Sequence, residues 1–144
     1  MVTSFRDLRV YGDARALARE IYALSKAWPR EERYSLTDQI RRASRSVMAN
    51  TAEAWRKRRY PKHFASKLSD AEAEACECRA WLDVALDCGH VDAATHNALD
   101  VRYHALIGGL VTMQRDSARR CSLASGAREP VVGYDTARGS EFPV

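Results

Sequence analysis

Residues 34–61 read YSLTDQIRRASRSVMANTAEAWRKRRYP, and this stretch decides the fold because its apolar and basic residues both recur at helical spacing. At ~100° per helical residue, one set of mainly small and apolar side chains falls within about 80° of arc. This set contains Leu36, Ile40, Ala43, Val47, Asn50 and Ala54. On nearly the opposite side, within about 60°, lie four arginines, Arg41, Arg45, Arg56 and Arg59. The stretch therefore predicts a helix with one face for packing and another for anions.

Three further segments carry apolar residues at alternating spacings of four and three, around residues 10–28, 64–85 and 99–113. Pro29 is expected to end the first helix, and Pro61 to open the third. Gly89 is expected to terminate the third helix, and Asp92 to cap the fourth. In the second helix we expect Ser35 to be the N-cap residue, with Asp38 as a weak capping-box partner.

Long helices with short connections and no strand-like alternation predict an all-α protein. The expected architecture is an antiparallel up-down-up-down four-helix bundle forming one domain over residues 1–121. Residues 122–144 are rich in Gly, Pro and Ser and lack periodicity, so we expect a disordered C-terminal tail.

Charge is distributed unevenly along the chain. Residues 41–67 hold nine Lys or Arg against one acid, whereas residues 68–100 hold eight acids against one Arg. The formal net charge of the whole chain is only +4. Such asymmetry indicates a charged partner, either nucleic acid or another subunit.

Catalytic and metal-binding signatures are weak. Cys76 and Cys78 are two residues apart and diverge by ~200° on a helix, so they do not form a chelating pair. Cys88 and His90 have no second pair of ligands in the sequence nearby. A phosphate loop, a nucleophile elbow and paired carboxylates in an apolar pocket are all missing from the sequence. We therefore expect no enzyme activity, no cofactor and no metal.

The N-terminal residues lack the apolar core of a signal peptide, and no window approaches the ~18–20 apolar residues that span a bilayer. The sequence thus predicts a cytoplasmic protein without a membrane partner.

The chain resembles the small four-helix-bundle proteins associated with 23S rRNA intervening sequences. The resemblance covers roughly residues 5–118, and its specific part is the block Gln39-Ile40-Arg41-Arg42-Ala43, followed by Asn50 and Ala52-Glu53. It implies assembly into a homopentameric ring and a role in binding structured RNA. A related group serves as accessory subunits of diversity-generating retroelements, where a basic ring contacts nucleic acid and a reverse transcriptase.

Ala54 stands where this family usually has glycine, the favoured helix terminator. We therefore expect the second helix to continue toward Tyr60 and to carry residues 56–59 as a rigid extension.

The predicted nucleic-acid contacts are the basic residues of the second helix and its extension. They are Arg41, Arg42, Arg45, Arg56, Lys57, Arg58, Arg59 and Lys62. Trp55 and Tyr60 are predicted to stack on unpaired bases, while Gln39, Asn50 and Glu53 are predicted to form a structural polar core. Two alternatives stay open for the arginines: a solvated helix face, or ion pairs with the acidic third helix of a neighbouring subunit.

Two functional hypotheses follow. The first is a non-enzymatic, homo-oligomeric bundle that binds nucleic acid, structured RNA rather than DNA, through this basic surface. The second is an accessory or scaffold subunit whose basic face docks on a partner protein such as a retroelement reverse transcriptase.

Overall fold

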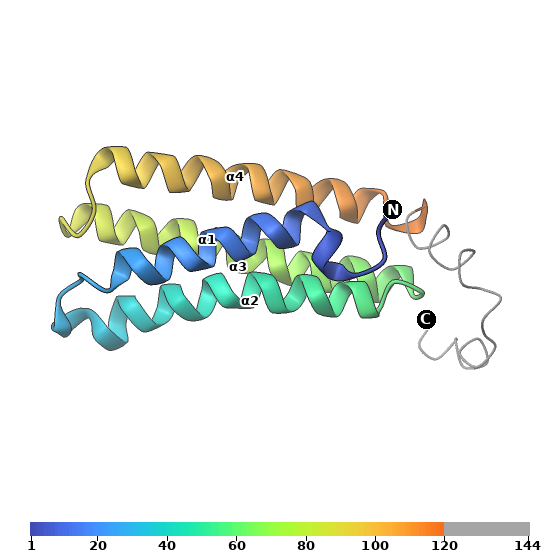
Figure 1. Cartoon of the computed structure of the whole chain (residues 1–144), viewed down its shortest axis with the longest axis horizontal. Coiled ribbons are helices and arrows are strands. Elements are labelled where there is room, and N and C mark those ends of the chain that lie inside the picture. Colours follow the sequence, from blue (N-terminus) through green and yellow to red (C-terminus); the bar gives the residue numbers. More distant parts are fainter. Residues whose placement is uncertain (120–144) are drawn as a thin grey trace.

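The computed structural model describes residues 1–119, in which every regular element is helical. Four long helices, α1 (Arg9–Ser25), α2 (Asp38–Arg56), α3 (Pro61–Asp87) and α4 (Ala93–Arg115), lie side by side as a helical bundle (Figure 1). The chain reverses direction at each connection between them (Figure 1). Three short elements precede α1 or link it to α2: η1 (Phe5–Asp7), η2 (Arg30–Glu32) and the π-helical turn η3 (Arg33–Thr37). The all-α prediction is confirmed, and the predicted tail at 122–144 lies outside the described residues.

The core consists of the apolar stripes that the spacing predicts. The stripe of α2 begins one turn earlier, in η3. Its members are at most 1% exposed and are Leu36 in η3 and Ile40, Ala43, Val47 and Ala54 in α2. The residues of the α3 stripe are at most 2% exposed and are Phe64, Leu68, Ala71, Ala75, Cys78, Leu82 and Ala85. Among helices that adjoin in the bundle, contact is most extensive for α2 with α3 and least extensive for α1 with α4. Small residues in both stripes explain this, because alanines let two helix backbones approach closely.

Three of the predicted helix boundaries are confirmed by their hydrogen bonds. Pro61 lies in the first turn of α3. Gly89 has φ 77°, and its N–H donates to Leu86 O at 3.0 Å. The next N–H, of His90, donates to Ala85 O at 2.8 Å, which completes a Schellman motif at the end of α3. Asp92 caps α4 by accepting a hydrogen bond from the Thr95 N–H at 2.8 Å.

The predicted N-cap at Ser35 is wrong. Ser35 lies inside η3, which runs directly into α2, so its backbone is helical where an N-cap residue needs an extended conformation. Its hydroxyl instead donates to Glu32 Oε1 at 3.0 Å, one turn earlier. The helical path therefore begins before the residue that the capping pattern indicated.

Glycines 108 and 109 of α4 lie in different surroundings and provide a matched test of the contact between α1 and α4. A Cβ at Gly109 would lie 2.9 Å from Val10 Cγ1, whereas a Cβ at Gly108 would meet nothing within 4 Å. We expect Gly108→Ala to raise the melting temperature, because alanine stabilises a helix interior by about 1 kcal/mol relative to glycine. Gly109→Ala should lower it, because displacing Val10 costs about 1–3 kcal/mol. Equal increases in the two variants, measured by thermal circular dichroism, would contradict this close approach.

Within residues 1–119, no helix is both long enough and apolar enough to cross a lipid bilayer.

Candidate nucleic-acid interface

Basic side chains line one side of both α1 and α2. On α1, Arg15, Arg19 and Tyr22 follow each other at spacings of four and three, and Lys26 comes four residues later at the helix end. Residues at these spacings share one face of a helix. On α2, Arg41, Arg45 and Arg56 share another such face. We call the six cations Arg15, Arg19, Lys26, Arg41, Arg45 and Arg56 the basic face.

Three cations of the basic face gather around the ring of Tyr22. The distances to the ring centroid are 4.8 Å from Lys26 Nζ, 4.7 Å from Arg41 Cζ and 5.6 Å from Arg45 Cζ. The electron-rich face of an aromatic ring attracts cations at such distances. Tyr22 is itself 41% exposed, so the ring and its cations lie at the surface.

An open depression of about 470 Å³ lies at this point between α1 and α2. We call it the basic groove; its lining residues are Tyr22, Asp38, Arg41, Arg42, Arg45, Ser46 and Ala49. Asp38 is the one acid among them. Within residues 1–119, no carboxylate forms an ion pair with Lys26, Arg41 or Arg45. Cations that outnumber the acids around them and form no ion pair create a positive potential that favours an anion.

Arg41 is held in place by the end of α1. Its Nε donates to Ser25 Oγ at 2.8 Å, and the Ser25 hydroxyl donates to Tyr22 O at 3.2 Å. Ser25 is only 2% exposed, so this contact is shielded from water. The half-buried Arg41 side chain is therefore held in one position in the groove, whereas the side chains of Lys26 and Arg45 are exposed and available to a ligand.

Arg42 lies at the edge of the groove, and its guanidinium group contacts α3. Its Nη2 lies 3.0 Å from Glu77 Oε2, and its Nη1 lies 4.0 Å from Glu74 Oε1. Burial, together with the neighbouring Glu77 carboxylate, raises the pKa of Glu74, while Arg42 opposes that shift. The pairing with the acidic helix that the sequence suggested between subunits thus forms within one chain, and this charge is partly neutralised.

The predicted extension of α2 to Tyr60 is wrong, because α2 ends at Arg56 and residues 57–59 form a turn. The cause is Pro61: the residue before a proline is restricted to extended backbone, and Tyr60 accordingly has φ −121° and ψ 91°. The turn remains basic, and Lys57 and Lys62 are exposed. The end of the bundle therefore carries a compact basic turn rather than a rigid arm.

The two aromatic residues near this turn are covered to different degrees, and the predicted base stacking is wrong for Tyr60. Tyr60 is only 5% exposed. Trp55 is half-buried, and the Arg58 guanidinium lies 4.0 Å from its ring centroid while Nη1 donates to Trp55 O at 2.8 Å. Arg58 thus covers part of Trp55, whereas Tyr22 keeps an exposed aromatic ring among three cations.

The predicted polar core also differs. Gln39 and Asn50 are half-buried, and Glu53 is exposed and lies 2.9 Å from Lys67 Nζ on α3. The hydrogen bond that the Glu53 carboxylate accepts from Lys67 raises the pKa of Lys67. The fully buried polar side chains of α2 are Ser44 and Thr51, whose hydroxyls donate to carbonyls one turn earlier. Glu53 therefore links two helices at the surface.

The pattern of helices and basic residues falls within a stretch that matches a known family. The family model for the 23S rRNA-intervening sequence protein matches residues 6–111, which is more than two thirds of the chain. The chain belongs to this family. The matched residues include the whole basic face and the turn after α2.

A solved structure supports the same fold. A crystal structure of a protein of unknown function from the S23 ribosomal protein family of Bacteroides thetaiotaomicron VPI-5482 is similar to this chain with a TM-score of 0.67. The two are 22% identical in sequence, and the similarity covers 74% of this chain and 95% of the other. No curated protein matches the chain.

Sequence reasoning missed the α1 half of the candidate interface. Arg15, Arg19, Tyr22 and Lys26 lie on the polar side of the first helix, and their spacing of four, three and four was a readable signal. The signal acquires meaning only once α1 packs beside α2, because the cations of the two helices then meet around Tyr22.

Proposed function

We propose that this protein is a non-enzymatic nucleic-acid-binding protein and that the basic face contacts the phosphates of a structured RNA. One observation carries the proposal: Lys26, Arg41 and Arg45 gather around the exposed Tyr22 without an acidic partner among the described residues. Guanidinium and ammonium groups bind phosphates through charge-assisted hydrogen bonds and release condensed counterions. The family description, which refers to a 23S rRNA intervening sequence, favours RNA over DNA.

The dimensions of the basic face suit a nucleic-acid backbone. Arg41 and Arg56 are fifteen residues apart on α2, which corresponds to about 22 Å at 1.5 Å per residue. A row of this length meets several successive phosphates. Such contacts fix position without reading sequence, so we expect recognition of shape and charge rather than of particular bases.

The same proposal includes assembly. The four helices would form an antiparallel up-down-up-down four-helix bundle that is the unit of a ring-shaped homo-oligomer, with five copies by family resemblance. The loosely packed side between α1 and α4 supports an interface there, since it holds an open depression of about 620 Å³. Its lining is apolar at Ala23, Leu24, Ala94, Ala98 and Leu99 and polar at Glu20, Thr95 and Arg102. A ring would repeat the basic face in every copy and so multiply its phosphate contacts.

A salt series tests the RNA-binding function. Six phosphate contacts per copy predict that log K falls with log salt concentration at a slope of about −4 to −5. Filter binding with a hairpin RNA measures the slope, and a DNA hairpin of the same sequence is the matched control. Size-exclusion chromatography with light scattering at each salt concentration reports the oligomer in parallel. An oligomer that binds neither hairpin at low salt would contradict the proposal and favour docking on a partner protein.

A further inference from the structure

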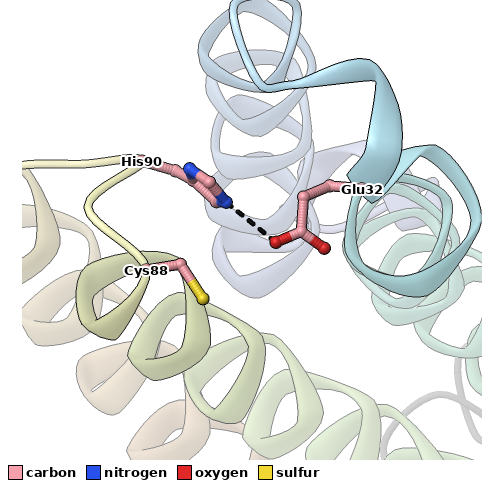
Figure 2. Close-up of side chains that lie close together, drawn as sticks. All are labelled: Glu32, Cys88 and His90. Carbon is pink, nitrogen blue, oxygen red and sulfur yellow. Dashed lines mark hydrogen bonds and ion pairs between the residues drawn. The ribbon is translucent and has the colours of Figure 1, made fainter.

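Three side chains with different metal-ligand atoms meet at the end of the bundle opposite the basic turn. Cys88 and His90 belong to the connection between α3 and α4, and Glu32 belongs to the connection between α1 and α2 (Figure 2). One ligand atom from each residue lies within 4.8 Å of the other two. His90 Nε2 is 2.8 Å from Glu32 Oε2. Glu32 and His90 are 58 residues apart in the sequence, so their contact joins two connections that are distant along the chain.

The backbone holds these residues firmly. The Schellman motif at Gly89 fixes the direction in which His90 leaves α3, and the Cys88 N–H donates to Val84 O at 2.9 Å. Glu32 is fixed by its own N–H, which donates to Pro29 O at 2.9 Å. The Ser35 hydroxyl donates to Glu32 Oε1 at 3.0 Å, so one carboxylate oxygen is already oriented and Oε2 faces His90. Such outer hydrogen bonds are what orient the ligands of metal sites.

The surroundings of the cluster suit a partly enclosed ion. The side chains of His90 and Glu32 are only 12% and 19% exposed, while Cys88 is exposed and leaves an entry from solvent. The Trp28 ring, which is 8% exposed, lies 6.2 Å from the His90 ring and forms an apolar wall. Low access to water strengthens the attraction between a cation and these ligands.

We propose that Glu32, Cys88 and His90 bind one Zn²⁺ ion, through a carboxylate oxygen, the thiolate and Nε2, with water as the fourth ligand. Thiolate with imidazole selects zinc over calcium and magnesium, which prefer oxygen ligands alone. In tetrahedral zinc sites, bond lengths of about 2.0–2.3 Å place the ligand atoms roughly 3.5 Å apart. The widest separation here is at most 4.8 Å, so closure by about 1 Å suffices. Rotation of the exposed Cys88 side chain and a slight opening of the contact between His90 and Glu32 provide it.

Zinc would cross-link the two connections at this end of the bundle. Cys88 must lose its proton to bind, so the affinity falls as the pH is lowered. The site shares no residue with the basic face, and its test is independent of RNA binding.

Cobalt titration of the metal-free, full-length protein under a reductant tests the proposal. Co²⁺ bound by a thiolate in tetrahedral geometry gives a charge-transfer band in the near ultraviolet and intense visible bands. We expect one equivalent per chain, displaced by Zn²⁺. At a hundredfold excess of Zn²⁺ over Kd, the melting temperature should rise by about 5–10 °C.

Single substitutions assign the ligands. Loss of an outer hydrogen-bond partner costs about 10- to 100-fold in metal affinity, so Cys88→Ser and His90→Gln should each weaken binding by at least about 100-fold. Cys76→Ser is the matched control, since Cys76 is an exposed thiol on α3 outside the cluster. Cys121→Ser controls for the thiol outside the described residues. Circular dichroism verifies that each variant is folded. A charge-transfer band that is missing from the wild type, or that persists in Cys88→Ser, would overturn the proposal.

Discussion

Replacing Arg19, Lys26 and Arg45 by glutamine should weaken RNA binding about 100-fold at 0.1 M salt. Each phosphate contact releases about 0.7–0.9 counterion, so three contacts release about two to three counterions. At this salt concentration, the release of one counterion favours binding about tenfold. The slope of log K against log salt should fall in magnitude by the same two to three. Lys26 and Arg45 lie against Tyr22, and Arg19 comes three residues before Tyr22 on the same face of α1. All three side chains are exposed and form no hydrogen bond to the protein among the described residues, so the fold should persist. Filter binding across a salt series measures both quantities.

A second triple variant separates the basic face from net charge. Arg9, Arg30 and Arg33 are exposed and lie outside the basic face, and their replacement by glutamine lowers the net charge from +4 to +1 as well. We expect less than about a threefold change in affinity, because charges away from the contact are screened beyond about 10 Å at 0.1 M salt. Equal losses in the two triple variants would show that net charge, not the groove, drives binding. An unaltered affinity in the first would locate the RNA elsewhere.

Local sequence patterns predicted the helices well. The buried positions Ile40, Val47 and Leu68 follow from a period that depends only on helix geometry, and all three are completely buried. The ends at Pro61 and Gly89 follow from backbone restrictions within one or two residues. The prediction failed at Ser35 and at the extension of α2. In both places it relied on one local signal and neglected a second signal that opposed it. At Tyr60 the restriction imposed by Pro61 outweighed the missing glycine.

The candidate sites depend on contacts between helices, which the period does not determine. The spacing placed Arg41, Arg42 and Arg45 on the surface of α2 but did not show that Arg42 meets Glu77 while Arg41 meets Tyr22. Glu32 became a neighbour of His90 only through the meeting of two connections at one end of the bundle. A single sequence holds no spacing signal for such a pair, because the residues between them form two whole helices.

Ile40→Ala should lower the free energy of unfolding by about 2–5 kcal/mol, the range for removing a large buried aliphatic side chain. Ile40 is completely buried in the first turn of α2, so the change removes apolar contacts and leaves a cavity that the surrounding helices fill only in part. The loss is a large fraction of the ~5–15 kcal/mol that stabilises a typical domain. Urea denaturation followed by far-ultraviolet circular dichroism, at one fixed protein concentration, measures it.

Val101→Ala is the exposed counterpart, because Val101 lies on α4 with 55% of its surface exposed. A surface truncation of this kind changes stability by about 0.5 kcal/mol or less. The contrast tests the rotation of α2 about its axis, on which the basic face also depends: the orientation that buries Ile40 places Arg41 beside Ser25 and Arg45 over Tyr22. If Ile40→Ala were as mild as Val101→Ala, Ile40 would not face the core. The cations of α2 would then not converge on Tyr22, and the candidate interface would lose its structural basis.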